Sequence, residues 1–145
     1  MASDYLFRGV SQTRGNPTLQ AGLRLESGTG LYYGAWASGL DIGPGKPHYE
    51  VDLFMGYTFD VGETASVDLL ANRYTYPEDG GSNYNELIAT TTLLDSYSLA
   101  LAYTNDVWGS GTDSWYYALL VRLPRSGNIW LDMHLGRTDF GRQIV

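Results

Sequence analysis

The segment EVDLFMGYTF, Glu50 to Phe59, decides the fold class of this chain. Its odd-numbered residues, from Val51 to Phe59, are all apolar, whereas its even-numbered residues include the carboxylates Glu50 and Asp52. Side chains leave an extended backbone on opposite faces in turn, so the alternation predicts a β-strand with one apolar and one polar face. A soluble β-sandwich contains strands of this kind, and so does a membrane barrel with lipid outside and water inside.

The same alternation recurs along the chain and predicts an all-β protein. Further strands are expected at residues 4–11, 18–26, 31–40, 66–76, 86–94, 97–104, 115–123 and 129–137. A tilted strand needs about 9 to 11 residues to cross a bilayer, and most of these segments are close to that length. No segment has a clear 3.6-residue period, so no helix is expected.

The connections between these strands alternate in length. Residues 12–17, 41–48, 77–84 and 105–113 form long connections, and residues 27–30, 60–63, 95–96 and 124–127 form short ones. In an up-and-down meander every second connection lies at the same end, so the long loops gather at one end, as they do in outer-membrane barrels. We therefore predict an antiparallel up-and-down meander that closes as a small transmembrane barrel of about eight to ten strands.

Composition limits the classes of function. The 145 residues are enough for one domain, and the net charge of −7 argues against nucleic acid as a partner. Cysteine is absent, which excludes disulfides and thiolate metal sites, and no apolar run approaches the length of a membrane helix. Met1-Ala2 is interpreted as a start that replaces a removed export signal, which predicts an outer-membrane location; the alternative is a cytosolic protein with its own initiator.

The polar faces of the predicted strands are expected to line a wet interior, since unpaired charges are costly to bury in a dry core. This set of interior side chains is Arg8, Arg24, Glu26, Glu50, Asp52, Asp68, Glu86, Arg122, Asp132 and His134. It holds more acid than base, which predicts a mild preference for cations. The alternative is that these faces contact bulk water around a soluble sandwich, but Lys46 is the only lysine, whereas soluble surfaces usually carry more.

The apolar faces are expected to contact lipid or detergent. This set is Leu19, Leu23, Val51, Leu53, Met55, Leu99, Leu101, Leu119, Val121, Leu131 and Met133. Several of these faces end in aromatic residues, among them Tyr57, Phe59 and Trp115, and such rings prefer the headgroup level of a membrane.

Five stretches carry a resemblance to a known family. They are Ser3–Thr13 (SDYLFRGVSQT), Trp36-Ala37-Ser38 followed by Asp41, Glu50–Leu53 followed by Gly56-Tyr57, Tyr74–Pro77, and Asn83–Leu87. Together they resemble the proteobacterial family of exported, uncharacterised Gcw-type conserved hypothetical proteins. The resemblance implies an exported outer-membrane β-barrel without an established activity. Members usually continue with further strands where this chain ends, so the resemblance also implies a C-terminally truncated barrel domain over residues 1–145.

Few residues form patterns that suggest a catalytic or metal-binding site. Asp132 and His134 share a strand face and need a third ligand to hold a metal, so an interior ion pair or a solvated histidine is the favoured interpretation. Glu50 and Asp52 share a face in a way that suits acid–base chemistry, but ion pairing is favoured; the candidate partners are Arg8, Arg24 and Arg122. No G-x-S-x-G nucleophile motif occurs. We therefore expect no enzymatic activity, metal or cofactor.

Two functions remain open at this point. The first is an outer-membrane β-barrel with a structural or small-channel role. The alternative is a soluble or peripheral barrel that binds a small ligand or glycan through its long-loop end, where Trp108 is a candidate contact. Arg8 is expected within ion-pair distance of Glu50, Asp52 or Glu86, because lipid would not accept it.

Barrel closure is the remaining expectation. An odd number of spanning strands leaves the chain on the wrong side for closure, since bacterial barrels have even strand numbers. Either residues 138–145 pair as a short further strand, or the chain self-associates through its free barrel edges.

Overall fold

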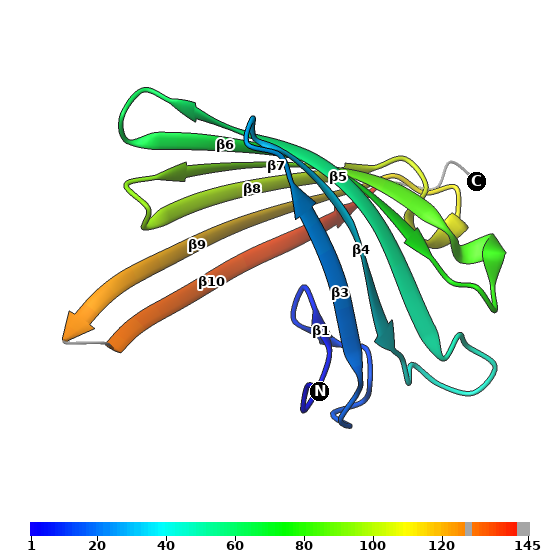
Figure 1. Cartoon of the computed structure of the whole chain (residues 1–145). Helices are drawn as coiled ribbons and strands as arrows, with labels where there is room; N and C mark the ends of the chain where they lie inside the picture. The colour runs from blue at the N-terminus through cyan, green and yellow to red at the C-terminus, as the bar shows by residue number, and fades with distance from the viewer. Residues whose placement is uncertain (127–128, 142–145) are drawn as a thin grey trace.

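The computed structural model describes residues 1–126 and 129–141, and most of the residues from Gln20 onward lie in or between strands of one sheet. The sheet contains eight antiparallel strands: β3 (Gln20–Glu26), β4 (Leu31–Gly39), β5 (Tyr49–Val61), β6 (Ala65–Thr75), β7 (Tyr84–Leu93), β8 (Tyr97–Thr104), β9 (Ser114–Ser126) and β10 (Ile129–Phe140). Each strand pairs with the next one along the chain. The all-β class and the up-and-down meander are therefore confirmed (Figure 1).

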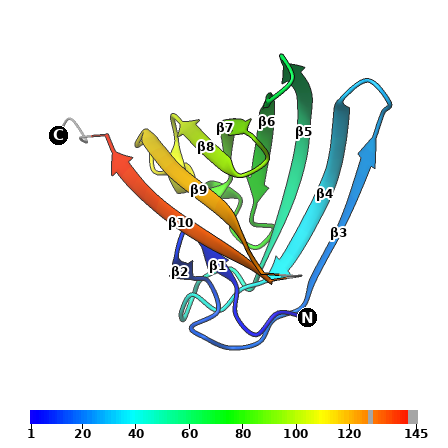
Figure 2. The same ribbon diagram turned by 90° about the vertical axis from the view of Figure 1, so that its left-hand side faces the viewer.

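The sheet curves strongly but does not close. β3 forms one edge and β10 the other, and among the described residues no pairing joins these two strands. Seen from the side, the strands form an open trough with a concave and a convex face (Figure 2). The predicted closed barrel is therefore wrong for this part of the chain. One reason is that residues 4–11, expected as its first strand, take no part in the sheet.

Residues 4–11 form a small hairpin instead. β1 (Leu6–Phe7) pairs with β2 (Val10–Ser11), and the two-residue turn between them is Arg8-Gly9, with φ of 51° and 82°. Positive φ at both turn residues is typical of the type I′ turns that join tightly paired strands. The hairpin lies on the concave side of the sheet (Figure 2). The predicted spanning strand at 4–11 is thus wrong, because its alternation continues through a turn.

The connections are sorted by length as predicted. Residues 40–48, 76–83 and 105–113 connect strands at one end of the sheet, and the last two contain the short 3-10 turns η1 (Gly80–Ser82) and η2 (Val107–Gly109). Tight turns lie at the other end. Because the hairpin is not a spanning strand, β3 begins at the long-loop end and β10 ends there.

The buried side chains lie on the concave face. One cluster is formed by Leu40, Tyr74, Tyr76 and Tyr84 with Tyr5 and Phe7 of the N-terminal segment packed against it, and a second by Ala102, Tyr116 and Ala118. Within the described residues the only second sheet is the two-stranded β1–β2 hairpin, which is too small to form the second layer of a sandwich. No helix in the described ranges is long and apolar enough to cross a membrane.

Candidate functional site

The N-terminal hairpin is fastened to the concave face through Glu86. This residue is only 2% exposed, and both of its carboxylate oxygens have partners. Arg8 Nη2 lies 2.6 Å from Oε1, and the Tyr74 hydroxyl donates to Oε2 over 2.9 Å. The Arg8 guanidinium also lies 4.1 Å from the centre of the Tyr116 ring. The predicted ion pair between Arg8 and an interior carboxylate is therefore confirmed.

A second contact between the N-terminal segment and the sheet involves Glu50. The Tyr5 hydroxyl donates to Glu50 Oε1 over 3.0 Å. Burial raises the pKa of Tyr5 far above its ordinary range, and the negative charge of Glu50 adds to this shift. Tyr5 therefore stays protonated and keeps its role as hydrogen-bond donor.

Asp52 is less well satisfied than its neighbours. It is 8% exposed, and its Oδ2 accepts a long hydrogen bond of 3.5 Å from Asn72 Nδ2. Its Oδ1 is buried without a hydrogen-bond partner among the described residues. A buried acceptor without a partner typically costs about 1–3 kcal/mol, and the neighbouring carboxyl group of Glu50 interacts with Asp52.

The favoured pairing of Glu50 and Asp52 with arginine is wrong. Arg8 contacts Glu86; Arg24 Nε lies 2.6 Å from Glu26, and Arg122 Nε lies 2.8 Å from Asp132. Arg24 and Glu26 lie on the same strand, and Arg122 and Asp132 lie opposite each other on paired strands. Arg24 and Arg122 therefore each have a carboxylate partner nearby and do not contact Glu50 or Asp52.

The other predicted interior side chains also lie on the concave face, nearer the tight turns. Asp68 accepts hydrogen bonds from the Tyr32 hydroxyl at 2.7 Å and from Thr58 Oγ1 at 2.6 Å, and Arg24 stacks 3.7 Å above the centre of the Tyr32 ring. His134 Nε2 lies 2.9 Å from the Tyr116 hydroxyl. No group of three or more His, Asp or Glu side chains in the described ranges is arranged to hold a metal ion.

The convex face exposes the apolar side chains. Of the predicted lipid-facing set, Val51 and Val121 are half-buried and the others are exposed, namely Leu19, Leu23, Leu53, Met55, Leu99, Leu101, Leu119, Leu131 and Met133. The charged side chains described on this face are Arg73, Arg137 and Asp139. All three lie near the long-loop end of their strands, so the side chains described in the middle of the face carry no charge.

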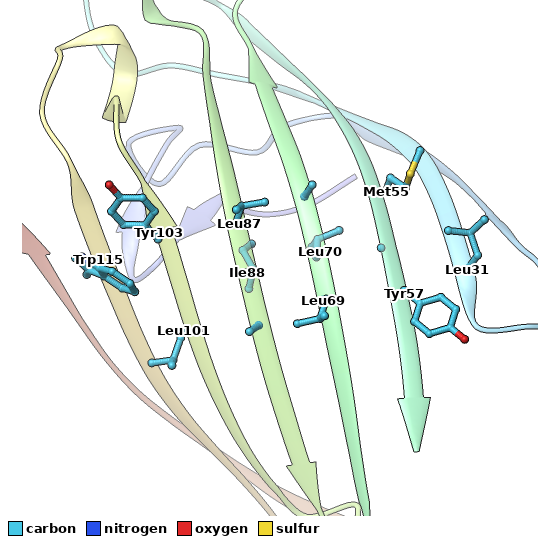
Figure 3. Close-up of a pocket in the computed structure, with 13 residues that line it drawn as sticks. Leu31, Met55, Tyr57, Leu69, Leu70, Leu87, Ile88, Leu101, Tyr103 and Trp115 are labelled. Carbon is cyan, nitrogen blue, oxygen red and sulfur yellow. The ribbon is translucent and has the colours of Figure 1, made fainter. Parts of the chain in front are cut away.

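A groove that was not predicted from the sequence crosses this convex face. It has a volume of about 660 Å³ and runs over strands β4 to β9. Leu31 and Tyr57 lie on one side of it and Tyr103 and Trp115 on the other (Figure 3). Ala71 and Ala89 contribute only methyl groups between larger neighbours such as Leu69 and Leu87. A signal was present in the sequence, since small residues occupy outward positions on two adjacent strands.

A second hollow adjoins the groove toward the long loops. It is lined in part by Met55, Ala71 and Leu87, which also line the groove, and it ends at Arg73 and Asn85. Arg73 Nη1 donates to Asn85 Oδ1 over 3.2 Å. The apolar groove is therefore continuous with a polar end that carries a cation.

Trp108 lies at the long-loop end, as expected for a loop residue. It is 50% exposed, has a positive φ of 52°, and its ring centre lies 6.3 Å from that of Phe140. It borders a cleft of about 500 Å³ between the hairpin and the long loops, which Arg14, Lys46 and Asp79 also line. In this cleft the predicted loop contact, Trp108, lies beside polar side chains of several loops.

Comparison with known proteins identifies the family. No curated protein and no solved structure matches the sequence. A family model described as "Bacterial protein of unknown function (Gcw_chp)" matches residues 1–145, in agreement with the resemblance drawn from the five sequence stretches. The chain therefore belongs to the Gcw_chp family of bacterial proteins of unknown function.

Proposed function

We propose that this protein is an outer-membrane β-sheet protein with a structural or small-channel role. The convex face contacts lipid, and the concave face lines a polar interior that the N-terminal hairpin partly fills. One observation carries the proposal: polar side chains such as Glu50, Asp52 and Glu86 are buried on the concave face, while most of the exposed large apolar side chains lie on the convex face. This arrangement is the reverse of a water-soluble protein and the normal one for a membrane barrel.

The energetic argument rests on the exposed apolar surface. Burial of one Leu or Met side chain contributes about 1.5–3 kcal/mol, and residues such as Leu23, Leu53 and Met55 are each more than half exposed. Monomeric soluble proteins rarely expose contiguous apolar patches larger than a few hundred Å². Contact with lipid tails removes this surface from water. The aromatic residues Tyr57, Tyr97 and Trp115 are suited to the interface regions of a bilayer.

The interior supports a preference for cations. Its carboxylates are Glu26, Glu50, Asp52, Asp68, Glu86 and Asp132, against the cations Arg8, Arg24 and Arg122. An acidic lining raises the local concentration of cations and excludes anions. Because the N-terminal hairpin occupies part of the space on the concave side of the sheet, its position sets the width of any passage there.

The two free edges require a partner. In lipid each bare backbone group costs several kcal/mol, and both β3 and β10 have one unpaired side among the described residues. We infer that β10 of one copy pairs with β3 of the next, so that copies of this chain complete a barrel together. The lipid bilayer, or detergent in solution, is then the second partner.

Substitution of Leu101 by Arg tests the membrane assignment. Leu101 is exposed on the convex face near the middle of β8, where an arginine facing lipid costs about 2–4 kcal/mol. Thr90→Arg is the matched control: it places the same charge on the concave face, opposite Asp68. We expect Leu101→Arg to lower the free energy of unfolding in lipid vesicles and Thr90→Arg to change it little. If the unmodified protein is folded and monodisperse without detergent, the membrane assignment is wrong.

The cleft at Trp108 favours a second candidate function, the binding of a small ligand or glycan. A half-exposed indole beside Arg14, Lys46 and Asp79 offers a stacking surface and hydrogen-bonding groups together. Titration with a panel of soluble oligosaccharides, followed by tryptophan fluorescence, tests this candidate. A response that Trp108→Ala abolishes and Trp130→Ala leaves intact supports it; no response in the unmodified protein contradicts it.

A further inference from the structure

We infer that the convex groove is a binding site for one lipid molecule with an anionic headgroup. Its acyl chain lies in the apolar groove over β5 to β8, and its headgroup phosphate binds Arg73. This inference rests on the proposed membrane location and deepens it, since it distinguishes one lipid site from the rest of the convex face.

The apolar part of the groove has the shape that an acyl chain needs. Ala71 and Ala89 leave space between the side chains of Tyr57 on β5 and Tyr103 on β8, and leucines line the rest of the wall (Figure 3). The surface of the groove is almost entirely apolar, so it favours an apolar ligand. A flexible chain of methylene groups fills such a space, and each buried CH₂ contributes about 0.8 kcal/mol.

The end of the groove provides the charge that selects the headgroup. Arg73 is exposed and donates one hydrogen bond to the neutral amide of Asn85, but no carboxylate lies within ion-pair distance among the described side chains. Arg137, also on the convex face, differs because its Nε lies 2.7 Å from Asp139. A guanidinium without a carboxylate partner has donors left for a phosphate, which it binds in bidentate geometry.

The position of Arg73 along its strand agrees with a headgroup contact. β6 ends at Thr75, two residues beyond Arg73, and the next residues belong to a long loop. The hollow beside Arg73 shares Met55, Ala71 and Leu87 with the groove, so tail and headgroup contacts form one continuous surface. A long arginine side chain at a strand end reaches the interface while its stem covers apolar surface.

The test measures retained lipid by native mass spectrometry in mild detergent. The full chain is supplied with phosphatidylglycerol, which is anionic, or with phosphatidylcholine, which has no net charge. We expect one phosphatidylglycerol per chain, retained about tenfold better than phosphatidylcholine, which corresponds to one charge-assisted contact. Arg73→Gln should reduce this preference to near one, and Ala71→Phe, which fills the groove, should lower retention of both lipids.

Two matched variants serve as controls. Arg137→Gln removes another arginine described on the convex face, and Ala37→Leu adds bulk on the convex face outside the groove, so both should retain lipid as the unmodified protein does. Equal retention of the two lipids by the unmodified protein overturns the inference. So does an Arg137→Gln loss as large as that of Arg73→Gln, which would indicate a general charge effect. Displacement of the lipid by millimolar inorganic phosphate would identify a free-phosphate site and also overturn it.

Failure of this inference is distinguishable from failure of the proposed function. Insertion of each variant into vesicles is measured first. If the unmodified protein does not insert, the membrane location is wrong. If it inserts normally and shows no preference between the lipids, the membrane location stands and the specific lipid site is wrong.

Discussion

Arg8 combines an unfavourable backbone conformation with a favourable long-range side-chain contact. Its backbone has a φ of 51°, in the left-handed region that costs a non-glycine residue roughly 1–2 kcal/mol. Its side chain reaches the buried Glu86 and stacks against Tyr116. The ion pair with Glu86 therefore offsets the strain in the Arg8 backbone. The Arg8-Gly9 turn positions the guanidinium for that ion pair.

Removal of the Arg8 side chain should be costly. Arg8→Ala leaves Glu86 buried without its cation, a situation that typically costs about 3–5 kcal/mol. Chemical unfolding in detergent measures the change. Arg14→Ala is the matched control, because Arg14 forms an ion pair of the same length with Asp41 but both side chains are well exposed, and such pairs contribute about 0–1 kcal/mol. Similar losses for both variants would show that burial of Glu86 does not matter.

At the residue scale, the sequence predicted the strand face on which a side chain lies better than it predicted the residue that this side chain contacts. Alternation placed Glu50, Asp52 and Glu86 on the polar face, and the expected contact between Arg8 and a carboxylate is present. Asp52 was expected in an ion pair and instead has one oxygen without a partner. The face of a side chain follows from its own strand, whereas its partner depends on which strands are neighbours and in what register.

At the scale of elements, two long loops are joined by a contact between His48 and Glu78. The His48 backbone N–H donates to Glu78 Oε2 over 2.6 Å, and the imidazole Nδ1 lies 3.2 Å from the same carboxylate. The backbone hydrogen bond lowers the pKa of Glu78, and the imidazole adds a smaller effect. A lowered pKa means that this contact contributes to stability above the ordinary titration range of glutamate and loses that contribution as the pH falls through the lowered value.

A titration of Glu78 followed by carboxyl carbon NMR checks this loop contact. We expect the midpoint to lie below the usual value of about 4.3 for glutamate. His48→Ala keeps the backbone N–H and removes only the ring, so most of the lowering should persist. A midpoint at the usual value in the unmodified protein would mean that the two loops are not in contact in solution.

Strand prediction succeeded where the two faces of a segment differ and failed where a turn interrupted the pattern. The strand expected at 97–104 has the observed bounds, and the other sheet strands differ only at their ends. Residues 4–11 alternate as well, but they form the β1–β2 hairpin. A turn with Asn-Gly is recognisable from sequence. Arg8-Gly9 is not, since arginine rarely takes the positive φ that it has here, where its side chain forms an ion pair with Glu86.

At the scale of the whole molecule, the N-terminal hairpin determines at which end the eight-stranded sheet begins. Because the N-terminal hairpin is not a spanning strand, the start of β3 and the long loops lie at the same end of the sheet. The Asp41 N–H donates to Gln12 O over 2.8 Å, which ties the N-terminal segment to the first long loop. The length pattern of the loops was readable from sequence, but the end at which the sheet begins depends on how residues 4–11 pair.

Cysteine labelling tests this arrangement in vesicles, and the chain has no cysteine of its own. Ser11→Cys lies in the hairpin, Ser82→Cys in a long loop and Ser96→Cys in a tight turn. With a membrane-impermeant maleimide, the first two variants should be labelled from the same side and the third from the opposite side. Labelling of Ser11→Cys and Ser96→Cys from one side would contradict the placement of the hairpin.

Closure is the property that the sequence predicted least well, because it depends on which edges meet and not on any one strand. Of residues 138–145, expected as a short further strand, 138–140 continue β10 and pair with β9, so they do not close the sheet, and 142–145 lie outside the described residues. In a meander of eight strands the first and last strands run in opposite directions. Copies with the same orientation in a membrane therefore place β10 of one antiparallel to β3 of the next.

Head-to-tail pairing of these edges gives the last prediction. Pairing of β3 with β3, or of β10 with β10, would require one copy to be inverted and its long loops to cross the bilayer, which buries their polar backbone in lipid. Leu23→Cys on β3 and Met133→Cys on β10 should therefore cross-link through a short bis-maleimide when the two variants are mixed in vesicles. Each variant alone should remain uncross-linked, and mass measurement in mild detergent should show an assembly. Cross-linking of Leu23→Cys with itself would indicate inverted pairing, and a stable monomer would mean that the edges of this sheet need no second copy.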